Sequence, residues 1–525
     1  MIHGMRFLDF ARNDRHSTGR NDRRVIFCLV LLLLPICLGA QTQAQRYIEK
    51  VAKEEPLRSA SWGVLAVSAR GDTLAKWNHL NKFVPASNIK LITTGTALHR
   101  LGGGYRFETV LAYDGAIVDS TLRGNLYIVG GGDPTLGAED GIALPTDTLF
   151  ARWKAILTGA GIYGIDGYVI GDGRWITDDQ EHGSWQLNDS GTYYGTGGNG
   201  LCFHENNIDF RVEPGDSVGA PPIFIRTSRA ETPWLTIRNY ATTGEKQTGN
   251  SLFLHASDLA PVAEWRGSLA IDRKKTVESV SNKYGAMTAA HNFCTYLDTS
   301  GFMVIDGPAD IDRAGLIRDF RSEPAIPARP VDSLTRIGST LSPTLSAIVA
   351  QTNGRSDNFY AESILRAIGR QVKGRTDYDS AIAAEKAVLS KIGVSTGNSV
   401  RLSDGSGLAR NNYASPDFFV RYLKAMWRTS ARSAFLGSLP RPGGKGTLQN
   451  MFQKADKDFK ARFRMKSGSM NGVLCYSGYL LPTGGSTASD GNVITFSILT
   501  NNASVGTSKV RPILEELLRL LAEEN

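Results

Sequence analysis

The pattern of hydrophobic and polar positions predicts a layered structure at both ends of the chain. Near the N-terminus it predicts a short helix, a two-stranded hairpin and a second helix, over residues 45–54, 61–68, 73–77 and 87–101. Near the C-terminus it predicts two neighbouring strands and an amphipathic helix, over residues 473–481, 492–500 and 512–524. These elements indicate an α/β sandwich whose two halves come from opposite ends of the sequence.

The segment between these ends has a different pattern. Frequent Gly, Asp and Pro separate short alternating runs, as at residues 124–129, 168–170 and 222–226. This is typical of a β-rich insertion, and an insertion is tolerated in a surface loop when its two ends lie close together. We therefore expect one main domain in two segments, 45–104 and 326–525, with inserted material over 105–325.

The first 44 residues are expected to form a secretory signal peptide. Arg23 and Arg24 precede an apolar run over residues 25–38, and small residues such as Ala40 and Ala44 follow it. The run is shorter than the ~20 residues that span a bilayer. We therefore expect an exported protein without a stable membrane span after cleavage, and an uncleaved membrane anchor is the alternative.

Length and composition describe an ordinary globular protein. The 525 residues exceed what one hydrophobic core organises, so two or more domains are expected. The formal net charge is +8, but residues 1–40 hold six Lys/Arg against three Asp/Glu, which leaves about +5 on the rest. No basic block is interleaved with aromatic residues, so nucleic acid is not indicated as a partner.

Three cysteines lie beyond the leader, Cys202, Cys294 and Cys475. They lack the C-x-x-C spacing of redox pairs and zinc knuckles. We favour three buried thiols that act as small apolar residues, and one disulfide with one free thiol is the alternative.

The first candidate for chemistry is Ser87-Asn88-Ile89-Lys90, at the start of a predicted helix. Residues i and i+3 share one face of a helix, so the Lys90 amine can reach the Ser87 hydroxyl. A lysine kept neutral by burial and nearby cations is a workable base for a serine nucleophile, and the start of a helix favours the oxyanion that forms during attack. Ser-x-x-Lys alone is common by chance, so its meaning depends on other motifs.

The second candidate is Ser356-Asp357-Asn358, expected in the turn between helices predicted over residues 341–352 and 359–369. Short polar side chains in such turns are usually helix caps. If the first motif is catalytic, Ser356 can pass a proton between Lys90 and a leaving amine. Asn358 can then hold a backbone amide of the substrate.

The third candidate is Lys466-Ser467-Gly468-Ser469, expected to begin an inner strand that runs toward Tyr476. A strand edge can pair with an extended peptide, and Gly468 removes bulk beside the scissile bond. Lys466 and the Ser467 hydroxyl offer a cationic pocket for a terminal carboxylate. The backbone N–H of Ser469 would be the second oxyanion donor beside that of Ser87.

Taken together, the motifs resemble those of peptidase family S13, the D-alanyl-D-alanine carboxypeptidase/endopeptidase group of low-molecular-mass class C penicillin-binding proteins. The resemblance extends over nearly the whole chain beyond the leader, and it is carried by residues 84–90, 130–136, 356–358, 404–410 and 443–448. Ser87 and Ser356 are 269 positions apart, which indicates a large insertion rather than a compact β-lactamase. One departure is Ser467, where the family usually has threonine, and it keeps the hydroxyl.

The resemblance implies a β-lactamase/transpeptidase-like sandwich, an antiparallel sheet flanked by helices and split by a β-rich insertion. It implies that Ser87 is the nucleophile, that Lys90 is the base and that Ser356 and Asn358 are the proton-relay and amide-binding pair. Lys466, Ser467, Gly468 and Ser469 would form the carboxylate and oxyanion side. The pocket for the side chain of the stem peptide would be formed by Asp172, Arg410 and Met470.

The implied activity is that of a periplasmic serine DD-peptidase. It would hydrolyse D-Ala-D-Ala termini or cross-links of peptidoglycan through an acyl-enzyme, bind penicillin covalently, and need no metal or cofactor. No H-E-x-x-H, G-x-S-x-G or phosphate-loop motif offers another mechanism. The alternatives are a β-lactamase or esterase of the same fold and a non-catalytic cell-wall-binding protein.

Overall fold

The structure is a computed structural model that describes residues 41–176, 178–311, 329–483 and 492–524. Residues from Gln43 onward form one compact unit. The predicted signal peptide lies outside the described residues except for its last four positions, and of these Gln43 and Ala44 already belong to helix α2 (Gln43–Val51). The expected boundary at residue 44 therefore falls inside a folded helix. Among the described residues, no helix is both long and apolar enough to cross a membrane.

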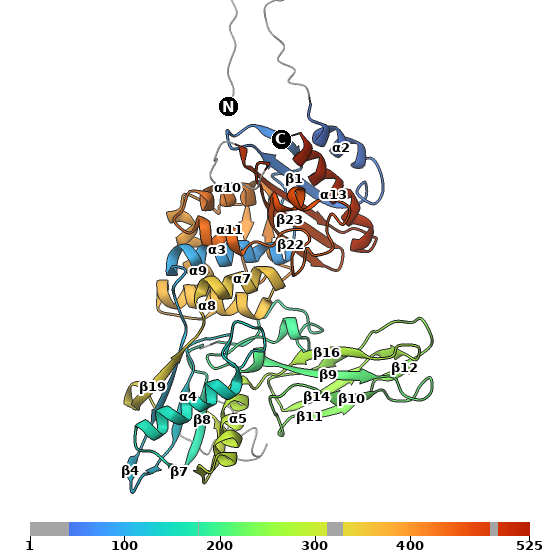
Figure 1. Ribbon diagram of the computed structural model, residues 1–525. Coiled ribbons are helices and arrows are strands. Elements are labelled where there is room, and N and C mark those ends of the chain that lie inside the picture. Colours follow the sequence, from blue (N-terminus) through green and yellow to red (C-terminus); the bar gives the residue numbers. More distant parts are fainter. Residues whose placement is uncertain (1–40, 177, 312–328, 484–491, 525) are drawn as a thin grey trace, which may run out of the picture. The chain divides into compact units, whose positions relative to one another are not determined.

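An antiparallel five-stranded sheet joins the two ends of the chain (Figure 1), with the strand order β2-β1-β24-β23-β22. The strands are β1 (Ser61–Val67), β2 (Thr73–Trp77), β22 (Phe463–Met470), β23 (Val473–Leu480) and β24 (Ile494–Asn501). β1 and β24 are paired from Ser61↔Asn501 to Val67↔Thr495. The predicted sandwich built from both ends of the sequence is confirmed.

Helices cover both faces of this sheet, so β23 and β24 are buried at every position. Leu474 and Tyr476 of β23 pack in a core with α2 and α13 (Thr507–Glu523). Val473 and Cys475, which point the opposite way along the strand, pack in the core of the other helices. Those helices are α3 (Ile89–Leu101), α7 (Leu345–Arg355), α8 (Asn358–Lys373), α9 (Tyr378–Lys391), α10 (Pro416–Trp427) and α11 (Arg432–Ser438).

Two details near the third motif differ from expectation. Strand β22 begins at Phe463, three residues before Lys466, and it ends at Met470. It is also the edge strand of its sheet rather than an inner strand. Tyr476 lies on the neighbouring β23, directly opposite Ser467. The Met465 N–H of its outer edge already donates to the Pro440 carbonyl, so a peptide could pair with this edge only beyond Met465.

The inserted segment begins with a five-stranded sheet of order β18-β8-β6-β3-β19, with its own hydrophobic core. Its strands and helices are β3 (Glu108–Tyr113), β6 (Leu126–Val129), α4 (Thr146–Gly159), β8 (Tyr168–Asp172), α5 (Gly285–Thr299), β18 (Gly307–Asp310) and β19 (Thr335–Leu341). A smaller sheet beside it has the order β17-β7-β5-β4, from Met303–Val304, Gly164–Asp166, Thr121–Arg123 and Ala116–Val118. β19 follows the expected end of the insertion at residue 325 but still belongs to its sheet.

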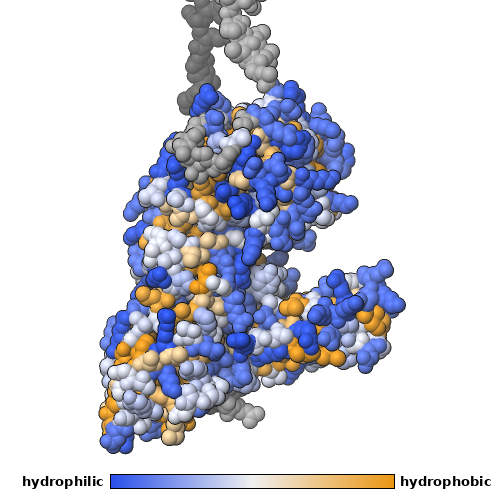
Figure 2. All heavy atoms as spheres, in the orientation of Figure 1, coloured by the Kyte–Doolittle hydropathy of each residue, from blue (hydrophilic) through white to orange (hydrophobic). Residues whose placement is uncertain are grey.

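A second module within the insertion consists of strands around a separate core, in which Phe224 stacks on Trp265. Its strands are β9 (Asn207–Glu213), β10 (Ile223–Arg226), β11 (Thr236–Asn239), β12 (Thr242–Gly244), β13 (Phe253–His255), β14 (Val262–Arg266), β15 (Ser268–Ala270) and β16 (Thr276–Ser281). Some of its large apolar side chains are exposed, among them Ile223 and Val277, and Figure 2 shows hydrophobic patches on this module. The insertion is thus rich in strands, as expected, and also carries helices α4 and α5.

The three cysteines of the described residues are buried, and none of them forms a disulfide. Burial raises the pKa of Cys202 and of Cys475 to about 12, so neither thiol is reactive at neutral pH. This agrees with the interpretation that they act as small apolar residues.

Candidate active site

Ser87 and Lys90 lie one turn apart where a short 3-10 turn (Ala86–Asn88) continues into α3. The Lys90 Nζ is fully buried and donates hydrogen bonds to Ser87 Oγ (3.1 Å), Asn358 Oδ1 (2.6 Å) and the Ser406 carbonyl (2.8 Å). These three bonds match the three donors of an ammonium group. If the group loses a proton, it can keep two of these acceptors and direct its lone pair at Ser87.

The environment of Lys90 favours this loss. Burial lowers the pKa of Lys90 to about 8, although the carboxylates of Asp404, Glu362 and Asp357 oppose the shift. A substantial fraction of the amine is therefore neutral just above neutral pH. The pair has the arrangement of a hydroxyl nucleophile and its base.

The turn Ser356-Asp357-Asn358 links α7 to α8 and reaches the same site. Ser356 ends α7 in the left-handed conformation (φ 63°), and Asp357 caps α8 by accepting the Tyr360 N–H at 3.0 Å. The Asn358 side chain contacts Lys90 through Oδ1 and donates from Nδ2 to the Tyr194 carbonyl at 2.9 Å. Hydrogen bonds at both Oδ1 and Nδ2 therefore fix the orientation of the Asn358 side-chain amide.

Lys466 is buried below the cleft and does not line it. Its Nζ donates to Ser356 Oγ and to the Ser467 carbonyl, each at 2.7 Å. Burial, and secondarily the charge of Lys90, hold the pKa of Lys466 well below its usual range. Lys466 is therefore hydrogen-bonded to Ser356 and does not present its amine to the cleft, unlike the expected cationic pocket.

Gly468 lets β22 approach the Ser87 segment closely. A Cβ atom at Gly468 would lie 2.6 Å from the Pro85 carbonyl oxygen and 3.0 Å from the Ser87 nitrogen. The flanking Ser467 and Ser469 both line the cleft, and the Ser467 hydroxyl donates to Thr447 Oγ1 at 3.0 Å. The backbone of β22 at Gly468, the residue before Ser469, therefore lies against the backbone of Ser87, a close approach of the kind that an oxyanion site needs.

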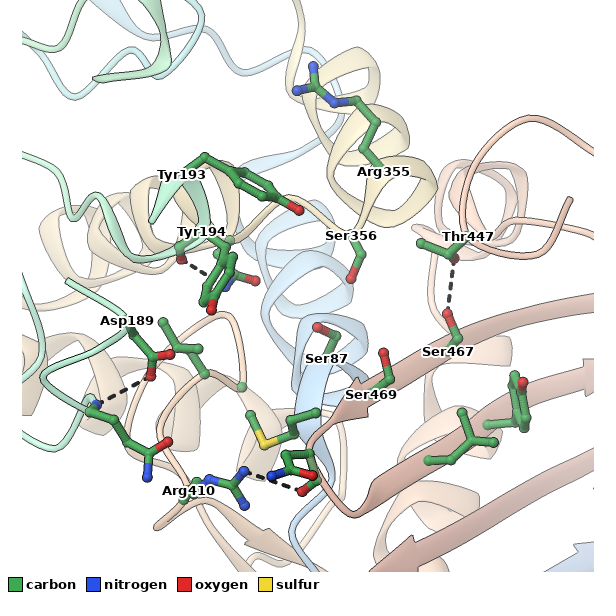
Figure 3. A pocket seen from close by; sticks show the side chains of 18 of the residues that line it. Ser87, Asp189, Tyr193, Tyr194, Arg355, Ser356, Arg410, Thr447, Ser467 and Ser469 are labelled. Atoms are coloured by element: carbon green, nitrogen blue, oxygen red, sulfur yellow. Dashed lines mark hydrogen bonds between the residues drawn. The ribbon is translucent and has the colours of Figure 1, made fainter. Parts of the chain in front are cut away.

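These groups open into a cleft of about 850 Å³. In Figure 3 the hydroxyls of Ser87 and Ser356 face each other across it, with Ser469 beside them on the strand. Four expected residues that line it with Ser87 are Ser356, Asn358, Arg410 and Met470. Lys90, Lys466 and Gly468 lie immediately behind this surface.

Asp172 is not brought to the cleft. It ends β8 inside the insertion, where it is buried and forms a 2.6 Å ion pair with Arg174. The acidic residue that lines the cleft near Arg410 is Asp189 (Figure 3). Burial raises the pKa of Asp189, and the positive charge of Arg410 opposes this shift.

Sequence reasoning also missed Tyr193, Tyr194, Thr447 and Arg511, which line the cleft. Thr447 lies within residues 443–448, one of the segments that carry the resemblance, although no role followed for it from that segment, whereas Tyr193, Tyr194 and Arg511 belong to no short motif. The two tyrosines come from the insertion, whose irregular pattern gave no sign of which loop would reach the site. Among the described residues, no three His, Cys, Asp or Glu side chains gather into a group that could hold a metal ion.

Comparisons with known proteins agree with this geometry. The model of the D-Ala-D-Ala carboxypeptidase 3 (S13) family matches residues 44–524. A D-alanyl-D-alanine carboxypeptidase of Actinomadura sp. (strain R39) is 27% identical over 93% of this chain and 89% of the relative.

Solved structures show the same fold. Penicillin-binding protein 4 of Haemophilus influenzae superposes with a TM-score of 0.74 at 20% identity, over 90% of this chain and 99% of that one. Its complex with a β-lactam superposes with a TM-score of 0.69 at 21% identity, over 91% and 98% of the two chains. The predicted fold class and family are confirmed: this chain belongs to the D-Ala-D-Ala carboxypeptidase 3 (S13) family of serine peptidases.

Proposed function

We propose that this protein cleaves the D-Ala-D-Ala end, or a peptide cross-link, of peptidoglycan by forming an acyl-enzyme on Ser87. The observation that carries the proposal is the 3.1 Å contact between Lys90 Nζ and Ser87 Oγ, at the foot of a cleft bounded by the open edge of β22. Family membership and the name of the Actinomadura relative support the substrate class.

In the acylation step, the Ser87 hydroxyl attacks the carbonyl carbon of the scissile amide and the neutral Lys90 amine takes its proton. The N–H groups of Ser87 and Ser469 stabilise the oxyanion of the tetrahedral intermediate. The C–N bond then breaks, and the proton held by Lys90 passes through the Ser356 hydroxyl to the leaving nitrogen. Lys90 is neutral again, and the acyl group is an ester of Ser87.

Water completes the cycle. It attacks the ester carbon while Lys90 takes a proton from it, and the Ser87 oxygen leaves with a proton returned by Lys90. The products are a shortened peptide acid and the free enzyme. Lys466, bonded to Ser356 Oγ, keeps that hydroxyl oriented for both halves of the reaction.

The cleft walls select the substrate. An extended substrate peptide pairs with the edge of β22 beyond Ser469. A side chain of this peptide then reaches the end of the cleft that is lined by Asp189, Arg410 and Met470. A substrate side chain that carries both an ammonium and a carboxylate group is complementary to the opposite charges of Asp189 and Arg410. Because peptidoglycan lies outside the cytoplasmic membrane, we place the protein in the periplasm.

The test is mass spectrometry of the purified protein with and without benzylpenicillin, together with release of D-alanine from a peptide that ends in D-Ala-D-Ala. We expect a covalent adduct and D-alanine release with wild type, and neither with Ser87→Ala. An adduct of equal yield on Ser87→Ala would refute the assignment of the nucleophile. An adduct that turns over within seconds would reassign the protein as a β-lactamase.

A further inference from the structure

We propose that Lys283, a buried residue of the inserted segment, is a positioning residue for the reaction. It fixes the loop of residues 189–196, whose Tyr194 carbonyl holds the side-chain amide of Asn358. The inference deepens the proposed peptidase function and rests on it. Lys283 belongs to none of the sequence motifs and does not line the cleft, so it acts on the reacting groups only through Asn358.

The ammonium group of Lys283 lies inside the protein and has a full set of partners. Its side chain is 1% exposed, and Nζ donates hydrogen bonds to the carbonyls of Gly195 and Thr196, each at 3.0 Å. It also forms an ion pair with the Glu181 carboxylate, and Asp258 adds a second negative charge nearby. The three acceptors match the three donors of an ammonium group. Because a buried charge without acceptors is costly, Lys283 resists any movement of these two carbonyls.

The rest of the loop is attached to strand β16, which immediately precedes Lys283 in the second module. The Ser281 N–H donates to the Gly191 carbonyl at 3.1 Å, and Thr192 forms a β-bridge with Val280. Lys283 extends this row of contacts to the end of the loop that lies nearest the catalytic turn. The loop is therefore held by the second module on one side and contacts the catalytic turn on the other.

The loop decides which end of the Asn358 amide faces Lys90. Tyr194, which lines the cleft (Figure 3), precedes Gly195, and its carbonyl accepts a hydrogen bond from Asn358 Nδ2 at 2.9 Å. A backbone carbonyl can accept only from the donor end of an amide. The bond therefore leaves Asn358 Oδ1 to accept from Lys90 Nζ at 2.6 Å. If the loop is released, the amide can turn, and Lys90 then faces an NH2 group that offers no acceptor.

A turned amide changes the protonation of Lys90. The hydrogen bond to Asn358 favours the ammonium form, so its loss lowers the pKa of Lys90. Removal of the Lys283 charge by itself would act in the opposite direction, because a cation nearby disfavours the ammonium form. The sign of the shift therefore reports the orientation of the Asn358 amide. Other charged groups that interact with Lys90 lie outside the loop: Asp404, Glu362, Asp357 and Lys466.

The experiment measures acylation by benzylpenicillin, followed by mass spectrometry, as a function of pH. For Lys283→Met we expect the maximal rate to fall about tenfold, because small displacements of reacting groups cost large factors in rate. The midpoint of the profile should move to lower pH by about 0.5 to 1 unit, the order of one weakened charged hydrogen bond. Lys275→Met removes an exposed cation next to the same strand and is the matched control.

A double-mutant cycle separates positioning from a general loss of structure. In an Asn358→Ala background there is no amide to orient, so Lys283→Met should change the rate by less than about twofold and leave the midpoint where it is. Lys283→Gln retains a neutral N–H donor and should recover part of the rate in the wild-type background. It gives the same two measurements if Lys283→Met does not yield folded protein.

The outcomes separate this proposal from the proposed function. An equal fold loss in the two backgrounds, or a midpoint that stays or rises when Lys283 is replaced, would overturn the positioning role and leave the peptidase function standing. Wild-type protein that is not acylated by benzylpenicillin would overturn the peptidase function itself.

Discussion

The Glu205 carboxylate of the inserted segment accepts two hydrogen bonds, of 3.1 and 3.0 Å, from the guanidinium of Arg355, the last residue of α7. Arg355 immediately precedes Ser356. On the other side of the same turn, the Tyr194 carbonyl accepts a hydrogen bond from Asn358. The insertion therefore contacts the turn Ser356-Asp357-Asn358 from both sides as well as lining the cleft, and we call these two contacts the brace.

The first prediction concerns this brace. Glu205→Gln keeps the shape of the side chain but removes its charge, so the turn that carries Ser356 is held less firmly. We expect the rate of acylation by benzylpenicillin to fall about tenfold, because small displacements of reacting groups cost large factors in rate. The control is Glu139→Gln, whose partner Arg229 is 3.8 Å away and exposed. Equal rates for Glu205→Gln and wild type would contradict the role of the brace.

The second prediction concerns pH. In the proposed mechanism only the neutral Lys90 amine accepts the Ser87 proton, and burial lowers the pKa of Lys90 to about 8. The acylation rate should therefore rise with pH and reach half its maximum near pH 8, as measured with a chromogenic cephalosporin between about pH 6 and 9.5. A flat or falling profile would count against Lys90 as the base.

The third prediction uses Glu362 to shift that profile. Its carboxylate accepts the N–H groups of Gly405 (3.0 Å) and Ser406 (2.8 Å), behind Lys90. Burial raises the pKa of Glu362 to about 7, so it is mostly ionised at pH 8 and favours the ammonium form of Lys90. Glu362→Gln removes this charge and should move the midpoint of the profile to lower pH. A midpoint that stays or rises would show that the charge does not act on Lys90.

The fourth prediction concerns the close approach at Gly468. The added methyl group in Gly468→Ala would meet backbone atoms of Pro85 and Ser87, so β22 must move away from the nucleophile. We expect acylation to slow by about 100-fold, while the melting temperature changes far less. Gly437→Ala, in α11 with no atom within 4 Å of the new methyl group, should leave the rate unchanged. A normal rate for Gly468→Ala would refute the close approach.

The fifth prediction concerns stability. Glu385 on α9 is buried, and burial raises its pKa to about 8, although the Thr93 side chain opposes this shift. The folded state then binds more protons than the unfolded state between about pH 4.5 and 8, so stability falls as pH rises through this window.

Glu385→Gln removes this dependence. Its advantage in unfolding free energy over wild type should grow by up to roughly 1.4 kcal/mol per pH unit across the window. Urea unfolding at pH 5 and pH 8 measures it, with the exposed Glu245→Gln as control. An advantage that is the same at both pH values would contradict the prediction.

Much of the fold and the centre of the site could be predicted from the sequence because the signals are local. Ser87 and Lys90 share a helix face by spacing alone, and the hairpin of β1 and β2 follows from period-two alternation around a turn. The strands β23 and β24 near the C-terminus are mostly apolar in sequence and buried at every position because both faces of the sheet are covered. Local pattern does not specify the strand order, so the edge position of β22 was missed.

The outer part of the site could not be predicted, because its residues meet only through tertiary packing. Asp189 and Tyr194 come from an irregular stretch of the insertion, whereas Asp172, which the family resemblance implied, ends a buried strand beside Arg174. Arg511 looks like an ordinary polar position of an amphipathic helix. Only the packing of α13 against the sheet brings it to the cleft.

The strand order has a consequence for synthesis. β1 pairs with β24, the central strand of the sheet. The hairpin of β1 and β2 is synthesised first, so it can pair fully with β24 only after residue 501 has been added. A polypeptide released before that point lacks a complete β24, the strand that joins β1 to β23, so the sheet that holds Ser469 near Ser87 is incomplete. We therefore expect the arrangement of Ser87 and the edge strand to form only after the last strand of the sheet has been synthesised.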